Sequence, residues 1–422
     1  MLTDIDPQAH GPFGEPMTEA VRACVHCGFC LAACPTYGEL GQEADTPRGR
    51  IVLMKEVLEG NLELEAALPH LDQCLGCLAC EPACPSGVRY RDLISPFRAL
   101  AQEKRRIGPL EKLRRRMVSA TLPHPARFRA AATMAKLAAP VRTALPAKMR
   151  AMLELLPSSL PAAQTLAEVN PARGTRRARV ALLAGCAQQV LDPDINAATI
   201  AVLTRNGVEV VVPKGQGCCG ALSWHVGDRE AAMGFARQNL AAFPDDVDAI
   251  VTNAAGCGSG MHEYPLILKG TADEDAARTF APRVCDVSVF LDRLGDLEEV
   301  PDSGETVRVA YHDACHLSNG QGVRAEPRRL LKRIPGLELV EIRHGHLCCG
   351  SAGTYNIDQP DIAASLGRKK AEAVVATGAP VVASGNIGCT TQLQAHLLRL
   401  GADVAVRHTV QILRDGYRGG AA

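Results

Sequence analysis

The sequence of 422 residues lacks the features that mark several large classes of protein. No uninterrupted apolar run approaches the roughly 18 residues of a membrane-spanning helix. Aromatic residues make up only 4% of the chain, so few rings are available to stack on bases, and nucleic-acid binding is not expected. No GxGxxG motif opens a helix after a strand and no P-loop is present, which argues against a dinucleotide site and against phosphate-loop chemistry. The composition predicts a soluble, globular protein.

Net charge is also absent, because 46 Lys and Arg residues balance 46 Asp and Glu residues, but the charges are unevenly distributed. Residues 1–100 contain 14 acidic and 7 basic side chains, whereas residues 101–150 contain 2 acidic and 13 basic ones. Within this basic stretch, apolar residues from Ile107 to Met117 recur at helical intervals, which predicts an amphipathic helical connector. Its basic face is either simply solvated, or docks on an acidic partner or an anionic membrane surface.

The beginning of the chain predicts where the protein resides. Its first residues are acidic and contain neither a basic start nor the apolar core of a secretory signal. We therefore predict a cytoplasmic location. The basic stretch would add a peripheral contact with the inner face of the cell membrane.

Cysteine, in contrast, is plentiful: the chain has 17, an odd number that cannot all pair. Eight of them form two runs with the same spacing, CxxCxxCxxxCP. Zinc sites usually have separated CxxC pairs, and disulfides belong to oxidising compartments, so this spacing favours iron-sulfur ligation. The two runs consist of Cys24, Cys27, Cys30 and Cys34, and of Cys74, Cys77, Cys80 and Cys84.

These runs resemble those of a two-cluster ferredoxin domain of the bacterial type, in which the fourth cysteine of each run serves the other cluster. The resemblance implies two [4Fe-4S] clusters. One would be held by Cys24, Cys27, Cys30 and Cys84, and the other by Cys74, Cys77, Cys80 and Cys34. Between the runs, Thr46 and Pro47 predict the start of a helix. Arg48 and Arg50 of that helix either offset the negative charge of a cluster or simply belong to the helix start.

The second half of the chain contains an internal duplication. After a linker over residues 151–175, short β-rich runs alternate with helix-length segments such as residues 194–205 and 228–242, which is typical of parallel α/β units. The cysteines then recur with intervals of 32 and 38 residues in the first copy and 33 and 40 in the second. They are Cys186, Cys218, Cys219 and Cys257, matched by Cys315, Cys348, Cys349 and Cys389.

We therefore predict an α+β multidomain fold. A mainly helical, ferredoxin-like domain with two [4Fe-4S] clusters occupies residues 1–100, and the basic helical connector occupies residues 101–175. Two tandem parallel α/β cysteine-rich repeats follow at residues 176–300 and 301–422. A loop after the carboxyl end of a strand is where α/β folds bind ligands, and each Cys-Cys-Gly sequence has this position.

This combination resembles the iron-sulfur subunits that carry duplicated cysteine-rich CCG domains. Such subunits belong to heterodisulfide reductase, anaerobic glycerol-3-phosphate dehydrogenase and lactate-utilisation systems. In order and length the chain is most similar to the iron-sulfur subunits of glycolate oxidase (glycolate dehydrogenase). The NAAGCG and HDACHL sequences around Cys257 and Cys315 favour that family.

The resemblance implies an electron-transfer subunit without catalytic residues of its own. Glycolate would be oxidised to glyoxylate at FAD held only by partner subunits. The electrons would pass through the clusters to a quinone or another membrane-linked acceptor. The alternatives are a heterodisulfide-reductase-like enzyme, and the iron-sulfur subunit of a lactate or glycerol-3-phosphate dehydrogenase.

The sequence departs from the full CCG pattern at one position of each copy. The pattern ends in CxxC, but Ala254 and Asn386 stand where its first cysteine belongs. The eight cysteines of the duplicated half either hold a further iron-sulfur cluster in at least one copy or are buried thiols of a retained scaffold. Four histidines flank these cysteines, and each is more readily interpreted as a hydrogen-bonded structural residue than as a group that tunes a cluster. They are His312, His316, His344 and His346.

Overall fold

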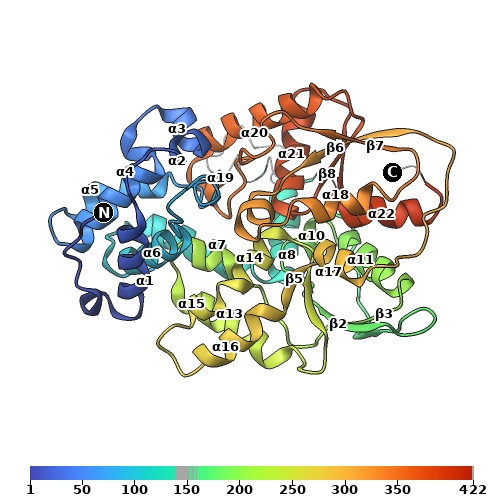
Figure 1. Ribbon diagram of the computed structural model, residues 1–422, viewed down its shortest axis with the longest axis horizontal. Coiled ribbons are helices and arrows are strands. Elements are labelled where there is room, and N and C mark those ends of the chain that lie inside the picture. The colour runs from blue at the N-terminus through green and yellow to red at the C-terminus, as the bar shows by residue number, and fades with distance from the viewer. Residues whose placement is uncertain (138–152, 154–155, 158, 421–422) are drawn as a thin grey trace.

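The computed structural model describes residues 1–137, 153, 156–157 and 159–420. Figure 1 shows a helical N-terminal part at the left and two α/β units stacked at the right, the first below and the second above. The predicted fold class, a helical ferredoxin-like part followed by two parallel α/β repeats, is confirmed. Among the described residues, no helix has both the length and the apolar character needed to cross a membrane.

The N-terminal part consists of short helices that surround the two cysteine runs. As predicted, Thr46 caps the helix after the first run: its hydroxyl accepts a hydrogen bond from the Gly49 amide, and Pro47 occupies the first helical position. The elements of this part are η1 (Pro7–Phe13), α1 (Gly14–Ala23), α2 (Cys30–Ala33), α3 (Pro35–Leu40), η2 (Glu43–Asp45), α4 (Pro47–Leu58), α5 (Leu64–Asp72) and α6 (Arg91–Lys104).

The connector begins as a helical hairpin of α7 (Pro109–Thr121) and α8 (Pro125–Leu137), which confirms the helix predicted after Pro109. Part of its basic charge is used within the chain. Arg114 pairs with Glu111 and with Asp358 of the second repeat, and Arg129 donates to the backbone carbonyl of Gln189 in the first repeat. The rest of the basic stretch after residue 137 lies largely outside the described residues.

The first repeat is built on a sheet of order β1-β3-β2-β4-β5, in which β2, β3, β4 and β5 are parallel and β1 joins the edge antiparallel. The interior strand β4 is buried along its whole length, as a strand covered on both faces must be. The elements are β1 (Val169–Asn170), β2 (Ala178–Leu182), α10 (Gln188–Leu191), α11 (Asp194–Arg205), β3 (Val208–Val211), α12 (Ala221–His225), α13 (Arg229–Ala242), β4 (Ala249–Thr252), α14 (Ala255–His262), α15 (Tyr264–Ile267), α16 (Glu274–Phe280), η4 (Ala281–Arg283), β5 (Val284–Asp286) and α17 (Val287–Leu294).

The second repeat has the same topology without the extra edge strand: its parallel sheet of order β7-β6-β8-β9 corresponds to β3-β2-β4-β5. The duplication inferred from the cysteine intervals is therefore a duplication of the sheet. The elements are β6 (Val307–His312), the π-helical turn η5 (His316–Gly320), α18 (Ala325–Leu331), β7 (Leu337–Glu341), α19 (Tyr355–Asp358), α20 (Pro360–Val375), β8 (Val381–Ser384), α21 (Ile387–Arg399), β9 (Ala405–His408) and α22 (Thr409–Tyr417).

The two repeats face each other with the carboxyl ends of their strands. The Ala255 amide donates to the Gly385 carbonyl, and the His408 ring hydrogen-bonds the Asn253 carbonyl across the boundary. One apolar core runs through both units, since side chains of β2 and β4 belong to the same cluster as those of β6 and α22. The cysteine loops of both repeats consequently lie at one internal junction.

Candidate metal centres

The first centre gathers cysteines from both runs. Cys24 follows α1, Cys30 opens α2, and Cys84 comes from the second run, yet all three line one cavity together with Cys27. This cavity encloses about 400 Å³, its open mouth included. The structure thus brings the fourth cysteine of the second run to the first three of the first run, and Cys80 of the second run lines the same cavity.

The backbone of each run turns back on itself through two residues with left-handed conformation. In the first run these are His26, with φ of 59°, and Gly28, with φ of 84°. In the second run they are Gly76, with φ of 64°, and Leu78, with φ of 58°. The two runs therefore share one backbone path, but each places a glycine at a different one of the two positions and tolerates a strained residue at the other.

The second centre is formed by thiols that are almost wholly buried. Cys74, Cys77, Cys80 and Cys34 each have an exposed fraction of 9%, and the thiol of Cys34 interacts electrostatically with both Cys77 and Cys80. The Thr36 hydroxyl lies 3.2 Å from the Cys34 sulfur, and the Tyr90 hydroxyl lies 3.8 Å from the Cys74 sulfur. These contacts place hydroxyl groups beside the buried thiols, although the Thr36 hydroxyl itself donates to the Asp45 carbonyl.

Arg50 supplies positive charge to this second centre from inside the fold. Its side chain is 1% exposed, its Nη1 lies 3.9 Å from the Cys34 sulfur and donates to the Thr36 hydroxyl, and its Nε donates to the His70 carbonyl. Burial by itself would raise the pKa of Cys74, but Arg50 and Arg98 lower it below its ordinary value. For Cys77 and Cys80, burial and neighbouring thiols raise the pKa well above the ordinary value.

Arg48 and Arg50 thus differ, although only one residue separates them. Arg48 is partly exposed and joins Glu43 and the His26 carbonyl near the first centre. The helix start is confirmed, since Thr46 caps the helix. Arg48 lines the first cavity and interacts electrostatically with Cys30 and Cys24, while Arg50 faces the Cys34 thiol of the second centre.

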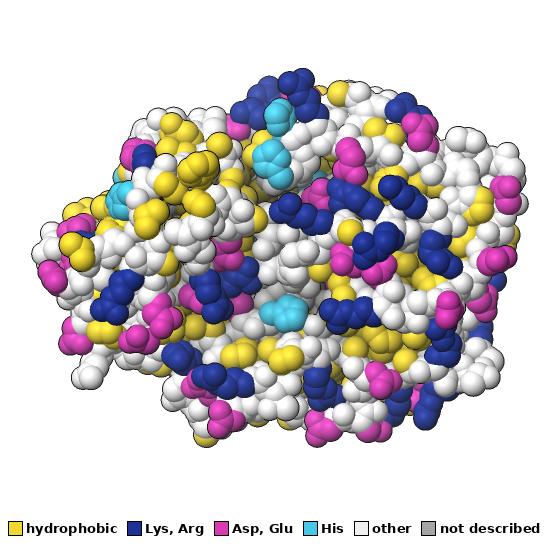
Figure 2. Space-filling view, viewed as in Figure 1, with side chains coloured by type: hydrophobic (Ala, Val, Ile, Leu, Met, Phe, Trp, Pro, Cys, Tyr) yellow, Lys and Arg dark blue, Asp and Glu magenta, His cyan; other side chains and the backbone are white. Residues whose placement is uncertain are grey.

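The two centres have unequal access to the surface. Cys27 is exposed, and the side chains on either side of it, Val25 and Phe29, are 64% and 68% exposed. Figure 2 shows apolar side chains gathered on the surface around α2 and α3. The second centre lies in the interior instead, between α6 and the two repeats.

The second centre contacts both repeats directly. The Asn319 side chain of the second repeat donates to the Cys77 carbonyl, and the Tyr355 hydroxyl donates to the Gln73 carbonyl. Arg98 donates both to the Cys74 carbonyl and to the His225 carbonyl of the first repeat. Cys315 also packs in one cluster with Cys77 and interacts with it electrostatically. The run from Cys74 to Cys84 is therefore the point at which all three folded parts meet.

Each repeat arranges its four cysteines as a row across the carboxyl ends of three parallel strands. In the first row Cys186 and Cys218 lie 3.5 Å apart, Cys218 adjoins Cys219, and Cys219 interacts with Cys257. In the second row the order is the same, from Cys315 through Cys348 and Cys349 to Cys389. All four cysteines of each repeat are thus brought together, and Cys285 belongs to neither row.

The charge environment differs between the rows. Neighbouring thiols and burial raise the pKa of Cys186, Cys219, Cys348 and Cys389 well above the ordinary value. In the second row, the neighbouring thiols and the His312 ring lower the pKa of Cys349 well below it, despite burial. Asn386, which replaces the missing cysteine of the full pattern, donates to the Cys389 sulfur at 3.4 Å.

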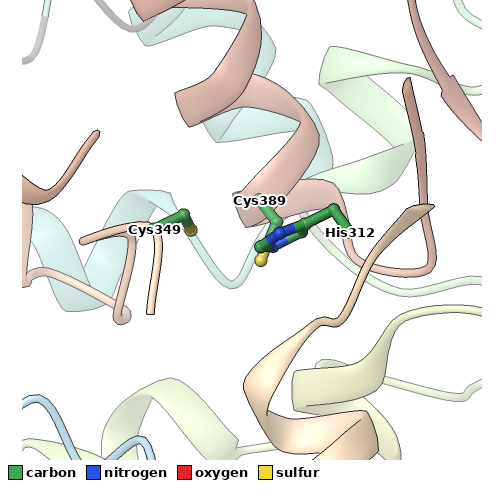
Figure 3. Close-up of side chains that lie close together, drawn as sticks. All are labelled: His312, Cys349 and Cys389. Atoms are coloured by element: carbon green, nitrogen blue, oxygen red, sulfur yellow. The ribbon is translucent and has the colours of Figure 1, made fainter. Parts of the chain in front are cut away.

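Of the four flanking histidines, only His312 is turned into a cysteine row. The structural interpretation is confirmed for His316, whose ring hydrogen-bonds Ser259 and stacks on His225. His344 and His346 are exposed on the loop before Cys348. For His312 that interpretation is wrong, because both ring nitrogens are buried and neither has a hydrogen-bond partner among the described residues. Figure 3 shows this ring beside Cys349 and Cys389.

Comparison with known proteins matches two family models. A "4Fe-4S dicluster domain" matches residues 20–88, and a "Cysteine-rich domain" of the CCG type matches residues 180–262 and again 309–394. The chain is 39% identical over 400 residues to the glycolate oxidase iron-sulfur subunit of Escherichia coli (strain K12), with 94% of each chain covered. It is 37% identical over 431 residues to the probable glycolate oxidase iron-sulfur subunit of Bacillus subtilis (strain 168), with 97% of each covered.

A more distant relative comes from a different system. The chain is 29% identical over 408 residues to a subunit of the fumarate reductase (CoM/CoB) of Methanothermobacter marburgensis, with 95% of this chain and 73% of the relative covered. A part similar to this chain therefore also occurs in a subunit of a different oxidoreductase.

Proposed function

Because this chain belongs to the family of glycolate oxidase iron-sulfur subunits, we propose that it carries electrons from glycolate oxidation away from a flavin-bearing partner. Oxidation of glycolate to glyoxylate releases two electrons, whereas an iron-sulfur cluster carries them one at a time. FAD in partner subunits would accept the pair, and a quinone or another membrane-linked acceptor would receive the electrons at the end. The chain itself supplies the path and no substrate-oxidising group.

We assign eight cysteines to the two [4Fe-4S] clusters that the dicluster domain carries. Cys24, Cys27, Cys30 and Cys84 hold one cluster, and Cys74, Cys77, Cys80 and Cys34 hold the other. The fit rests on two observations: all four cysteines of the first set line one cavity, which Cys80 of the second set borders, and the second set is buried beside Arg50, whose charge opposes that of thiolate-bound iron. When bound, the clusters supply reversible one-electron redox chemistry.

The unequal exposure of the two centres gives the path a direction in space. The observation that carries the proposal is that Cys27 of the first centre is exposed and flanked by the exposed apolar side chains of Val25 and Phe29, whereas the cysteines of the second centre are buried. Exposed apolar side chains around a redox centre are typical of a surface that a partner covers. We place the flavin-bearing subunit there, so that electrons enter at the first centre and move inward to the second.

The eight cysteines of the repeats are proposed as ligands of further metal. They are Cys186, Cys218, Cys219 and Cys257 in the first row, and Cys315, Cys348, Cys349 and Cys389 in the second. Four adjoining thiols at the carboxyl ends of parallel strands offer a complete ligand set for a further iron-sulfur cluster in the first row, where binding to different irons would draw Cys186 and Cys218 apart from their 3.5 Å contact. The contact of Cys315 with Cys77 would place metal in the second row next to the buried centre.

Helix α7 supports a peripheral membrane contact at the cytoplasmic face. Its side chains Leu110, Leu113 and Met117 are 80%, 55% and 60% exposed and share one helical face, with Lys112 and Arg116 on the same helix. A helix with an exposed apolar stripe and basic flanks binds anionic lipid surfaces. We expect the chain to sediment with anionic vesicles and not with neutral ones. Replacement of Leu110, Leu113 and Met117 by Ser should abolish this, and equal behaviour of both proteins would exclude the contact.

The proposed division of labour can be tested with the chain alone and with its flavin-bearing partner co-expressed. Glycolate-dependent reduction of a dye should require the complex, and the reduced clusters should then be visible by electron paramagnetic resonance. Dye reduction by the isolated chain would contradict the proposal, as would clusters in the complex that glycolate never reduces.

A further inference from the structure

The inference begins with the buried imidazole of His312. This residue ends β6, is 1% exposed, and has neither ring nitrogen hydrogen-bonded within the described part of the chain. A buried polar group without a partner costs free energy, and native proteins rarely keep one unless an ion or a ligand completes it. The ring acts on the neighbouring Cys349 thiol, and an ion shared with that thiol would complete the coordination of both groups.

The surroundings of the ring identify the chemistry of that partner. A nitrogen of His312 and the sulfurs of Cys349 and Cys389 all lie within 4.8 Å of one another, and all three residues are buried. Three different parts of the repeat converge here: the end of β6, the loop after β7, and the first turn of α21. Figure 3 shows the imidazole and the two thiols turned toward a common space.

The spacing fits one metal ion better than a cluster. In a tetrahedral site with zinc-sulfur bonds of about 2.3 Å, two ligand sulfurs are about 3.8 Å apart. Thiolates on different irons of a [4Fe-4S] cluster are farther apart, because the distance between the irons adds to their separation. Donor atoms that already lie within 4.8 Å of one another need only a small contraction around a single ion.

We propose that the second repeat binds one zinc ion through His312, Cys349 and Cys389. The thiol of Cys348, which adjoins that of Cys349, is the candidate for the fourth ligand. Imidazole and thiolate are the donors that zinc prefers in tetrahedral protein sites. This inference deepens the proposal that the repeats bind metal, and replaces an all-thiol cluster by a histidine-containing site in the second row.

Two neighbouring groups fit this assignment. Asn386 donates to the Cys389 sulfur, which orients a ligand thiolate in the way that outer hydrogen bonds do in metal sites. Lys370 is 4% exposed, its Nζ donates to the His344 and Gly345 carbonyls, and it interacts electrostatically with Cys349 and Cys389. A buried ammonium beside the row would balance the negative charge of its thiolates.

The first repeat offers an internal control. The residue three positions before Cys186 is Leu183, which corresponds to His312 before Cys315 and is equally buried. The fold therefore accepts an apolar side chain of similar size at this position, and the first row has no imidazole. We expect the histidine-containing site in the second repeat alone.

The test compares the full chain, purified anaerobically with its clusters, with His312→Leu, which copies the first repeat. Zinc and iron are counted per chain by mass spectrometry, and X-ray absorption at the zinc edge reports the ligands. The native chain should hold about one zinc with one nitrogen and two or three sulfurs. His312→Leu should lose most of that zinc and keep its iron, whereas the exposed-site control His346→Ala should keep both.

A second variant keeps the test decisive if His312→Leu folds poorly. His312→Cys should retain zinc but show a shell of sulfur alone. Full zinc retention by His312→Leu, a native zinc shell without nitrogen, or loss of about four irons on Cys389→Ala would each overturn the proposal. None of these results would touch the electron-transfer function, whose failure would show as clusters that glycolate does not reduce.

Discussion

The two ferredoxin-type centres are built from runs with the same spacing, yet they occupy opposite environments. The first centre lies at the surface, where Cys27 is exposed between Val25 and Phe29, while the second is enclosed by α6 and both repeats. A repeated motif therefore fixes the ligands of a cluster but not its surroundings. The surroundings decide which centre meets a partner and which centre holds the domains together.

The largest contrast is expected from the ligands themselves. Cys27→Ser should remove one cluster, and with it about four irons, while the rest of the chain stays folded, because an oxygen ligand replaces thiolate poorly at the surface centre. Cys77→Ser should also lose a cluster, but in addition loosen the repeats, because the run that loses its cluster packs against Cys315 and carries the Cys77 carbonyl to which Asn319 donates.

Iron analysis and limited proteolysis of both variants measure this contrast. Cys285→Ser, which alters a cysteine outside every set, is the control. Full iron content in either ligand variant would refute the assignment, and equal proteolysis of the two would remove the contrast between the centres.

A smaller but still large contrast is expected between the neighbouring arginines. Arg50→Gln should destabilise the protein by about 3–5 kcal/mol, because it removes a buried guanidinium that donates to the His70 carbonyl and the Thr36 hydroxyl and balances the charge of buried Asp45, which keeps its contact with the His70 ring. Arg48→Gln should cost at most about 1 kcal/mol, since the Arg48–Glu43 pair is partly exposed and screened by water. Denaturant unfolding of the cluster-loaded protein measures the free energy of unfolding of each variant. Similar decreases in the two variants would contradict the stronger burial of the second centre.

The strained backbone positions should respond with opposite signs. His26→Gly relieves a left-handed conformation at an exposed residue, so it should stabilise the protein by between about 0 and 1 kcal/mol. Leu78→Gly relieves the same conformation but removes a side chain that is 4% exposed, and should destabilise by about 1–3 kcal/mol. Thermal unfolding of each variant provides the measurement. Stability changes of the same sign in the two variants would show that the different burial of His26 and Leu78 does not decide the effect.

The smallest change in stability is expected from a substitution at the exposed apolar surface around the first centre. Phe29→Glu should leave iron content and stability unchanged and weaken binding of the flavin-bearing subunit about tenfold, as loss of an apolar anchor does at an interface. Leu398→Glu, at a similarly exposed leucine on α21, is the matched control. Titration of the chain with its partner measures the affinity. Unchanged binding by Phe29→Glu would move the docking surface away from the first centre.

Local patterns in the sequence were enough for much of the architecture. The helix predicted over residues 194–205 has the bounds of α11, and Thr46 is recognisable as a helix start because capping chemistry is local. The duplicated cysteine intervals predict two equal sheets, and both have the same strand order. His312 shows the limit of this reasoning: its interpretation as a hydrogen-bonded structural residue is wrong, because no local pattern reveals whether a buried ring has a partner.

The chemistry of this protein can be recognised from local sequence: two CxxCxxCxxxCP runs, a repeated cysteine pattern, and helices and strands set by periodicity within about 15 residues. Which run is buried, that Arg50 lies at the second centre while Arg48 lies at the first, and that Cys315 packs beside Cys77 became known only from the folded structure. Those relations join residues far apart in the chain, and they depend on how whole domains pack against one another. Spacing along a chain specifies which atoms can bind a metal, whereas burial, charge and access arise from the packing that surrounds them.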